Sequence, residues 1–240
     1  MRYERFCPIC REGADKFKPY GVAETPDAWC PNCGSMERYR LLYLYLRRET
    51  NLFKEPNTLI EIGPRKEFRQ LLQSYPNINY VGLDLDIDWN RPRANLQADM
   101  TRMPFRDDTA DFIIAYHVLE HLSNPQAGLA EIQRVLKPGG IALLQVPIDI
   151  DREITYEDPL VITEEDRIRV YGQKDHLRIY GNDFDQVVGA TGFSVTRIKY
   201  VEKFSAKTRT LLGLKDTFAL QTYTTCEDIF IATKPQNSRQ

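Results

Sequence analysis

The N-terminal segment of the chain carries four cysteines in two closely spaced pairs. Each pair has the form Cys-Pro-x-Cys, nineteen residues separate the pairs, and their members are Cys7, Cys10, Cys30 and Cys33. Each short turn can aim two thiolates at one ion, so the two turns together match a four-cysteine zinc ribbon. The strand and helix context of a redox Cys-x-x-Cys motif is missing here. The pattern therefore predicts a structural zinc ribbon over residues 1–35, with no open coordination position for catalysis.

Two roles for this predicted ribbon remain open. The zinc can staple a segment that is too short to form a core of its own. Alternatively, the ribbon can help to recognise a substrate, with Arg38 and Arg40 directly after it binding an anionic group. Such arginines also commonly pair with neighbouring acids or extend into solvent. Basic and acidic residues nearly balance over residues 1–40, so no phosphate-binding face is indicated.

The chain has three histidines, and two of them occur together. His117 and His121 flank the sequence Val-Leu-Glu directly after an apolar stretch, and His176 lies in a polar, tyrosine-bearing segment over residues 171–181. An imidazole at such a place can take a proton from a hydroxyl group at neutral pH. The alternatives are that the first two order a loop and that His176 lies on the surface. We keep all three as candidate catalytic residues.

Polar residues follow three short apolar stretches at the points where strands would end. Glu61 and Gly63 end the first, Asp84 ends the second, and Asp99 and Met100 follow the third. A glycine lets a ligand approach the backbone, and Glu61 could hold an ammonium group. Asp84 lies about twenty residues beyond Gly63, where a carboxylate can accept hydrogen bonds from both ribose hydroxyls of a nucleoside. Asp99 and Met100 could bind the amino group and the face of an adenine.

Alternating strands and amphipathic helices are predicted to position these residues. Mostly apolar strands separated by helices are typical of a parallel sheet that is covered on both faces. Ligands bind such sheets at the carboxyl ends of the strands. The first helix is expected to be capped by Ser35, and a later one to end at the Pro-Gly-Gly of residues 138–140. The expected strands cover residues 58–62, 79–84, 96–98, 111–115 and 141–146.

Residues 111–147, which combine a buried strand, the His/Glu turn, a helix and a Leu-Lys-Pro-Gly-Gly break, resemble the second half of a class I S-adenosylmethionine-dependent methyltransferase. The resemblance covers residues 58–147 well and residues 182–232 more loosely. It implies an α/β fold with a Rossmann-like, doubly wound, mostly parallel seven-stranded sheet over residues 36–240. It also implies that residues 148–181 form an insertion or cover on the substrate side.

The same resemblance implies S-adenosylmethionine as cofactor and assigns roles to site residues. Glu61 and Gly63 would face its methionine end, Asp84 its ribose and Asp99 its adenine, and Tyr116 would line the cleft. The loop of this chain departs from the family's glycine pattern, because Arg65 and Glu67 replace the second and third glycines of that pattern. S-adenosylmethionine has no phosphate, so the cofactor tolerates this loss better than a dinucleotide would. The departure leaves the detailed contacts of the loop open.

The acceptor is the least determined part of the function. The Cys-Pro-x-Cys start and the Asp-His-Leu-Arg-Ile-Tyr-Gly segment look like a bacterial and phage group of zinc-ribbon methyltransferases with poorly defined acceptors. We expect a small molecule such as a sugar, a metabolite or an envelope precursor. Some related quinone-pathway enzymes bind a divalent metal with a similar Glu-His turn, which would here be Glu120 and His121.

Two further functions remain as alternatives. A known group of ribosomal RNA methyltransferases also places a zinc ribbon before a class I domain. The net charge of −2 and the lack of an Asn/Asp-Pro-Pro-Tyr/Phe motif argue against RNA. A non-catalytic binding subunit is the second alternative, and it rests on the altered glycine loop.

Composition adds bounds to these expectations. With 240 residues, 42% of them hydrophobic and 28% charged, the chain has the composition of an ordinary globular domain. It contains no apolar run of eighteen residues and no apolar signal core at its start, so we expect a cytoplasmic protein.

Overall fold

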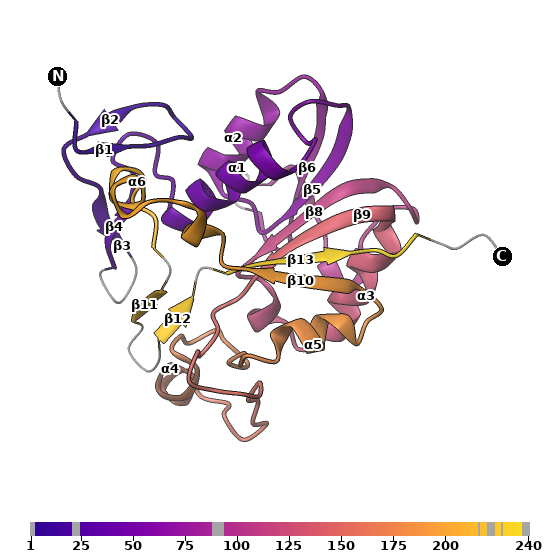
Figure 1. Cartoon of the computed structure of the whole chain (residues 1–240). Helices are drawn as coiled ribbons and strands as arrows, with labels where there is room; N and C mark the ends of the chain where they lie inside the picture. The colour runs from indigo at the N-terminus through magenta and orange to yellow at the C-terminus, as the bar shows by residue number, and fades with distance from the viewer. Residues whose placement is uncertain are drawn as a thin grey trace.

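Seven strands form the central sheet of the protein (Figure 1), which we describe from a computed structural model. The structure describes residues 3–20, 25–87, 94–215, 217–219, 224–226 and 228–236. The strand order is β10-β13-β9-β8-β5-β6-β7, and β13 runs antiparallel to both of its neighbours while the other pairs are parallel. The sheet is therefore mostly parallel, as predicted. Its strands are β5 (Asn57–Ile62), β6 (Ile78–Asp84), β7 (Leu96–Gln97), β8 (Ala110–Tyr116), β9 (Leu136–Gln145), β10 (Ser194–Ile198) and β13 (Ile229–Thr233).

Helices cover both faces of this sheet (Figure 1). Successive strand side chains point to opposite faces, so Leu59 packs in one core and Ile60 in the other. The first core includes α1 (Glu37–Glu49) and α2 (Lys66–Gln73), and the second includes α3 (Pro125–Val135) and α5 (Phe184–Gly189). The two apolar cores hold the sheet rigidly between them.

The N-terminal segment forms two small two-stranded sheets beside α1 and α6 (Ala206–Leu212) (Figure 1). Their strands are β1 (Arg5–Phe6), β2 (Gly13–Ala14), β3 (Lys18–Tyr20) and β4 (Thr25–Trp29). Arg40 of α1 joins these parts, because its buried guanidinium donates hydrogen bonds to the carbonyls of Asp27, Ala28, Ser35, Leu212 and Gly213. The expectation that Arg40 binds an anionic substrate group is therefore wrong.

Two predicted element ends also differ from the structure. Ser35 does not cap α1, which begins at Glu37 after Met36 without a side-chain cap. The Ser35 hydroxyl lies instead 3.2 Å from the sulfurs of Cys7 and Cys33. At the other point, α3 ends at Val135 and β9 begins at Leu136, so the strand already includes the Lys-Pro-Gly-Gly sequence. Leu136 pairs with Ala110 of β8 and Ile141 pairs with Phe112, so the Lys-Pro-Gly-Gly residues lie in an irregularity between two paired positions of β9.

Residues 148–181, which we name the cover segment, return to the sheet edge near the turn that follows β8. The segment contains α4 (Glu164–Tyr171), and isolated bridges pair Ile148 with Tyr180 and Tyr156 with Ile179. The short helical turns and remaining strands are η1 (Met100–Arg102), η2 (Leu119–His121), η3 (Tyr200–Lys203), β11 (Thr217–Ala219) and β12 (Thr224–Cys226). Among the described helices, none is long and apolar enough to span a membrane.

Candidate functional site

Gly63 forms the turn that leaves β5 at the carboxyl edge of the sheet. Its φ of +64° lies in the left-handed region that favours glycine, and its N–H donates to the carbonyl of Leu83 at 2.9 Å. A β-carbon at this position would lie 3.1 Å from Cγ2 of Val118. Only a glycine keeps this turn open next to the residues that follow β8.

Glu61 precedes this turn and is fully buried. Its Oε2 accepts a hydrogen bond from the Tyr80 hydroxyl at 2.7 Å, and Oε1 lies 3.5 Å from the backbone N–H of Arg65. Burial raises the pKa of Glu61 to about 8, although both hydrogen bonds act in the opposite direction. In this arrangement Glu61 ties β5 and β6 to the loop. Tyr80 was not found from the sequence, where it is one of several residues in an apolar strand.

The predicted nucleoside contacts follow β6 and β7. Asp84 is half-buried at the end of β6, and its Oδ1 lies 3.4 Å from the backbone nitrogen of Asp86. Asp99 is exposed, and its Oδ1 accepts hydrogen bonds from the backbone and the hydroxyl of Thr101, both at 2.8 Å. Met100 is buried and packs in the core against Gly128 of α3. The two carboxylates thus lie at one edge of the sheet, where Asp99 also caps η1.

The two side chains that replace loop glycines pair with each other. Nε of Arg65 lies 3.3 Å from Oε1 of Glu67, and the Glu67 side chain is largely buried. The loop therefore begins α2 with an internal ion pair in place of flexible glycines. The sequence did not show this ion pair, because there Arg65 and Glu67 were noted only as replacements of loop glycines.

All three histidines of the chain gather around one buried glutamate, Glu120. We name these residues the Glu120 cluster, and it consists of His117, Glu120, His121 and His176. Nδ1 of His117 lies 3.4 Å from Oε1 of Glu120, and Nε2 of His121 lies 4.0 Å from the same oxygen. The rings of His121 and His176 meet edge to face with their centres 4.9 Å apart. The sequence placed His117 and His121 in one turn but did not bring His176 to them.

The electrostatics of the Glu120 cluster follow from its burial. Burial by itself raises the pKa of Glu120, but the neighbouring histidines, His117 first, lower it more, so the net direction is downward. Burial and then the positive charge of Arg38 lower the pKa of His117. Burial also lowers the pKa of His176. The Glu120 cluster therefore combines a carboxylate with two weakly basic imidazoles, those of His117 and His176.

Tyr116 and Arg38 lie on the side of this cluster that faces α1. Tyr116 is buried, and its ring centre is 5.9 Å from that of Tyr39. The Arg38 side chain is largely buried, and its Nε has no hydrogen-bond partner among the described residues. Nη1 of Arg38 lies 3.5 Å from Oε1 of Glu37, so Arg38 pairs with a neighbouring acid and keeps Nε for a further anionic group.

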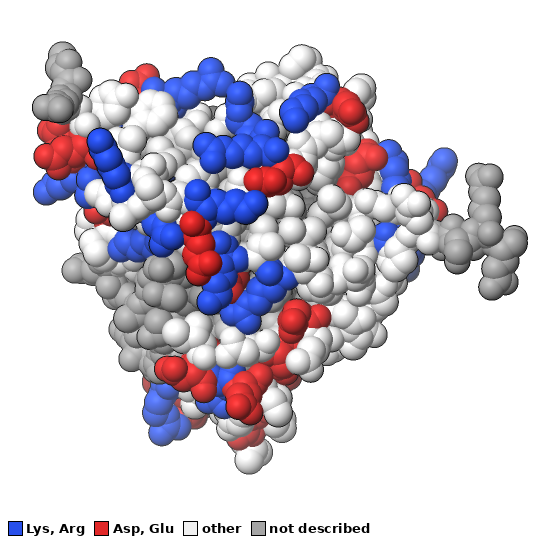
Figure 2. All heavy atoms as spheres, in the orientation of Figure 1, with Lys and Arg blue, Asp and Glu red and all other residues white. Residues whose placement is uncertain are grey.

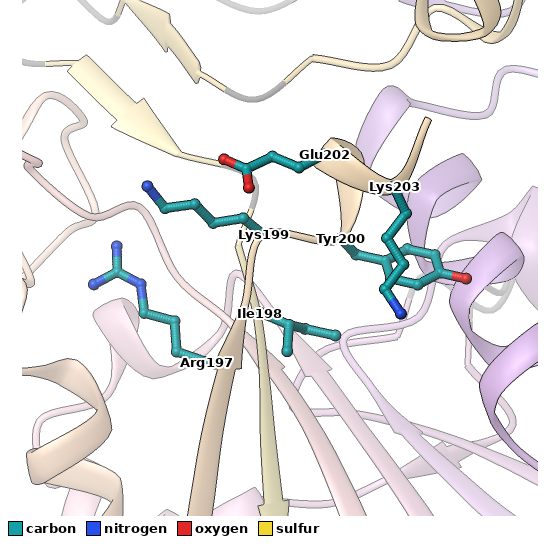
Figure 3. Close-up of a pocket in the computed structure, with 6 residues that line it drawn as sticks. All are labelled: Arg197, Ile198, Lys199, Tyr200, Glu202 and Lys203. Atoms are coloured by element: carbon teal, nitrogen blue, oxygen red, sulfur yellow. The ribbon is translucent and has the colours of Figure 1, made fainter. Parts of the chain in front are cut away.

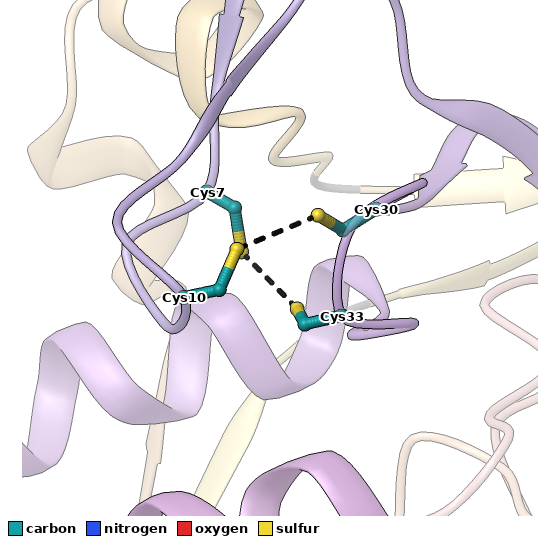
Figure 4. A group of neighbouring side chains, drawn as sticks. All are labelled: Cys7, Cys10, Cys30 and Cys33. Carbon is teal, nitrogen blue, oxygen red and sulfur yellow. Dashed lines mark hydrogen bonds between the residues drawn. The ribbon is translucent and has the colours of Figure 1, made fainter.

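The four N-terminal cysteines converge on one point (Figure 4). Sulfur–sulfur distances are 3.7 Å between Cys7 and Cys33 and 3.8 Å between Cys10 and Cys30. These distances are far too long for disulfides, whereas four thiolates at zinc–sulfur bonds of about 2.3 Å would lie about 3.8 Å apart. The turns match each other, because Arg11 donates to Cys7 O at 2.8 Å and Gly34 to Cys30 O at 2.9 Å. The site could hold a tetrahedral metal ion.

An open surface pocket of ≈ 590 Å³ lies at the end of β10 (Figure 3). Its lining consists of Arg197, Ile198, Lys199, Tyr200, Glu202 and Lys203 (Figure 3). In the strand order, β13 and β9 separate β10 from β8. The pocket therefore does not coincide with the strand ends that carry Gly63, Asp84 and the Glu120 cluster.

Comparisons with known proteins agree with this architecture. Residues 62–144 match a family model described as a methyltransferase domain. An uncharacterized methyltransferase of Mycobacterium tuberculosis (strain H37Rv) is 28% identical over 100 residues, which are 38% of this chain and 39% of that protein. The chain thus spans about two fifths of the length of these curated relatives.

Solved structures extend the likeness over most of the chain. The [4+2]-cyclase SpnF has a TM-score of 0.55 at 16% identity, covering 92% of this chain and 88% of its own. Phosphoethanolamine N-methyltransferase 2 of Haemonchus contortus, solved in complex with S-adenosyl-L-methionine, has a TM-score of 0.53 at 14% identity, covering 82% and 52%. At such identities the likeness shows the fold alone. Residues 62–144 are thus similar to a methyltransferase domain, and the chain has a Rossmann-like, mostly parallel seven-stranded sheet.

Proposed function

We propose that this chain is an S-adenosylmethionine-dependent methyltransferase that acts on a small-molecule acceptor. The observation that carries the proposal is the carboxyl edge of the sheet. Gly63, Asp84 and Asp99 lie at the ends of three adjacent parallel strands there, within the segment that matches a methyltransferase domain. Ligands bind doubly wound sheets at this edge.

The residues at this edge fit S-adenosylmethionine by their chemistry. Asp84 would accept hydrogen bonds from the ribose and Asp99 from the adenine amino group, with Met100 beneath it. Gly63 would lie against the methionine part of the cofactor. Glu61 would stabilise the loop that carries Gly63 from inside the protein. Bound S-adenosylmethionine supplies a methyl group on a sulfonium, so the protein mainly has to position two reactants.

The Glu120 cluster would contact the acceptor. His117, His121 and His176 are the candidates to take a proton from a hydroxyl acceptor, and Tyr116 would line the cleft beside them. Arg38 would bind an anionic group of the acceptor. We propose that the cover segment closes this site, which is supported by the hydrogen bond between Leu177 N and Glu120 O at 2.9 Å.

We further propose that residues 1–35 are a zinc ribbon ahead of a domain over residues 36–240. The sulfur–sulfur distances of a thiolate tetrahedron support this assignment. Arg40, which binds both the N-terminal segment and α6, favours a stapling role for the zinc over a recognition role. Chelation of the zinc should then lower the thermal stability of the whole protein.

A small acceptor is favoured over RNA by the distribution of charge. On the face shown in Figure 2, lysine and arginine side chains spread over the region of α1, α6 and the end of β10, with acidic side chains mixed among them. RNA binding depends on a basic surface that neutralises several phosphates. RNA would make activity fall by orders of magnitude between 50 mM and 200 mM salt, whereas a small acceptor would not.

Calorimetric titration of the zinc-loaded protein with S-adenosylhomocysteine tests the proposed cofactor site. Asp84→Ala should weaken binding by about 10- to 150-fold, because a charge-assisted hydrogen bond contributes about 1.5–3 kcal/mol. Asp86→Ala, which removes an exposed carboxylate two residues away, is the matched control and should bind normally. Absence of binding to folded wild-type protein would contradict the proposal. Binding without transfer to any small hydroxyl compound or RNA would favour a non-catalytic subunit.

A further inference from the structure

We propose that Glu120, His121 and His176 form a binding site for a divalent transition-metal ion at the carboxyl edge of the sheet. One ligand atom from each of these residues lies within 4.8 Å of the others. Among the described residues, only the four cysteines form another such group. Two imidazoles and one carboxylate are a ligand set for Zn²⁺ or Fe²⁺ that leaves coordination positions open.

The carboxylate of Glu120 lacks the partners that a buried charge needs. The side chain is 1% exposed, and within the described ranges neither of its oxygens accepts a hydrogen bond. Its nearest polar neighbours are the imidazoles of His117 at 3.4 Å and His121 at 4.0 Å, which carry a positive charge only when protonated. Burying a carboxylate without donors costs several kcal/mol unless a cation compensates it. A metal ion would supply that compensation.

The rings of His121 and His176 are each held by a contact of Nδ1 with a backbone carbonyl, which leaves Nε2 for the site. Nδ1 of His176 lies 3.1 Å from the carbonyl oxygen of Tyr171, and Nδ1 of His121 lies 3.2 Å from that of Asp175. A carbonyl can only accept, so each Nδ1 carries the proton and each Nε2 keeps its lone pair. Nε2 of His176 is buried without a partner in the part of the chain that is described. Metal-binding histidines are oriented by this kind of second hydrogen bond.

Two separate segments supply the three ligands, and backbone contacts fix them together. Glu120 and His121 belong to η2, while His176 follows α4 in the cover segment. Leu177 N donates to Glu120 O at 2.9 Å, and the buried guanidinium of Arg178 donates to the carbonyls of Leu119 and Leu122. The backbones that carry the ligands are therefore in place before an ion binds.

The distances allow coordination with small side-chain movements. Metal–nitrogen and metal–oxygen bonds of about 2.0–2.2 Å place ligand atoms at most about 4 Å apart. In a tetrahedral site such bonds place the ligand atoms about 3.3–3.6 Å apart, so three atoms that lie within 4.8 Å of one another have to close by at most about 1.5 Å. If the proposed methyl transfer is correct, a bound ion would occupy the lone pairs of His121 and His176, so His117 would remain as the candidate base. The open positions of the ion could then bind the acceptor oxygen.

Cobalt titration of the full-length protein, with zinc kept in the cysteine site, tests this inference. We expect wild-type protein to bind one Co²⁺ in addition to its zinc, with visible absorption bands but without thiolate charge-transfer bands. His176→Gln and Glu120→Gln should each weaken this binding by about 10- to 100-fold or more. Glu164→Gln, which removes an exposed acid from α4, is the matched control and should bind like wild type.

The outcomes separate this inference from the proposed function. A wild-type protein that takes up cobalt only at the cysteines, or glutamine variants that bind it normally, would overturn the metal site. S-adenosylhomocysteine titrations on the same samples report the cofactor site independently. Cofactor binding without cobalt binding refutes the metal alone, and cobalt binding without cofactor binding refutes the methyltransferase alone. Circular dichroism of both glutamine variants confirms that any loss is not unfolding.

Discussion

Replacing Glu61 by glutamine should remove a pH dependence of stability that the wild-type protein carries. Glu61 is fully buried, and its pKa is raised from 4.5 to about 8, mainly by burial. Between these two pH values the folded protein holds a proton at Glu61 that the unfolded chain has released. The contribution of Glu61 to stability is therefore fully present below pH 4.5 and is lost as the pH rises towards 8. Glutamine has nearly the same shape and can still accept the hydrogen bond of Tyr80.

The size of the effect follows from the pKa. At 1.36 kcal/mol per pH unit, raising the pKa from 4.5 to about 8 corresponds to about 5 kcal/mol of lost stability above pH 8. Relative to Glu61→Gln, the free energy of unfolding of the wild type should fall by about 1.4 kcal/mol per pH unit between pH 5.5 and 7.5. The glutamine variant should then be the more stable protein at pH 8.5.

Urea unfolding of both proteins at several pH values and constant ionic strength measures this difference. Groups that titrate identically in the two proteins, including the cysteines, cancel in the comparison. Glu55→Gln, an exposed glutamate ahead of β5, controls for the removal of one acidic side chain and should not diverge from wild type. Parallel stability profiles for wild type and Glu61→Gln would refute the reasoning, because Glu61 would then be ionised in the fold at low cost.

Three further predictions concern the turn, the N-terminal junction and the cysteine site. Gly63→Ala should cost about 1–3 kcal/mol in urea unfolding and weaken S-adenosylhomocysteine binding, because φ is +64° and Val118 is close. Arg40→Met should cost about 3 kcal/mol or more, since five backbone carbonyls lose their donor. Ser35→Ala should lower zinc affinity about 10- to 100-fold in competition with a chelator, because its hydroxyl contacts two cysteine sulfurs.

Matched variants isolate each of these effects. Gly189→Ala at the end of α5 meets no close atom and should be neutral or slightly stabilising. Arg48→Met removes an exposed arginine of the same helix as Arg40 and should cost less than about 1 kcal/mol. A Gly63→Ala protein as stable as Gly189→Ala, or an Arg40→Met protein as stable as Arg48→Met, would contradict the reading of those sites. Unchanged zinc affinity in Ser35→Ala would show that its hydroxyl does not support the cysteines.

The order of strands and helices was predictable because it depends on local pattern. Alternating apolar strands and amphipathic helices predicted five strands of the sheet to within a few residues, and the final sheet is mostly parallel as expected. The paired Cys-Pro-x-Cys turns likewise predicted that four thiols meet. In these cases the interacting residues are close in sequence or follow from the rule that parallel strands end at one edge.

Other features depend on contacts between distant parts of the chain, which become visible once the chain has folded. Arg40 resembled a surface arginine in the sequence, yet the fold surrounds it with carbonyls from the N-terminal segment and the end of α6. Ser35 had the pattern of a helix cap, but two cysteine sulfurs compete for its hydroxyl.

The candidate site also combines features that the local sequence predicted with features that depend on the fold. The residue types at the strand ends could be read from the local pattern, because a strand's end is a local property. It could not determine that His176 meets Glu120, since that contact depends on how the cover segment returns to the turn after β8. Nor could it show that Glu61 is buried against Tyr80. Burial and pairing across long sequence separations set the charge of these groups, and they exist only once the two cores have packed against the sheet.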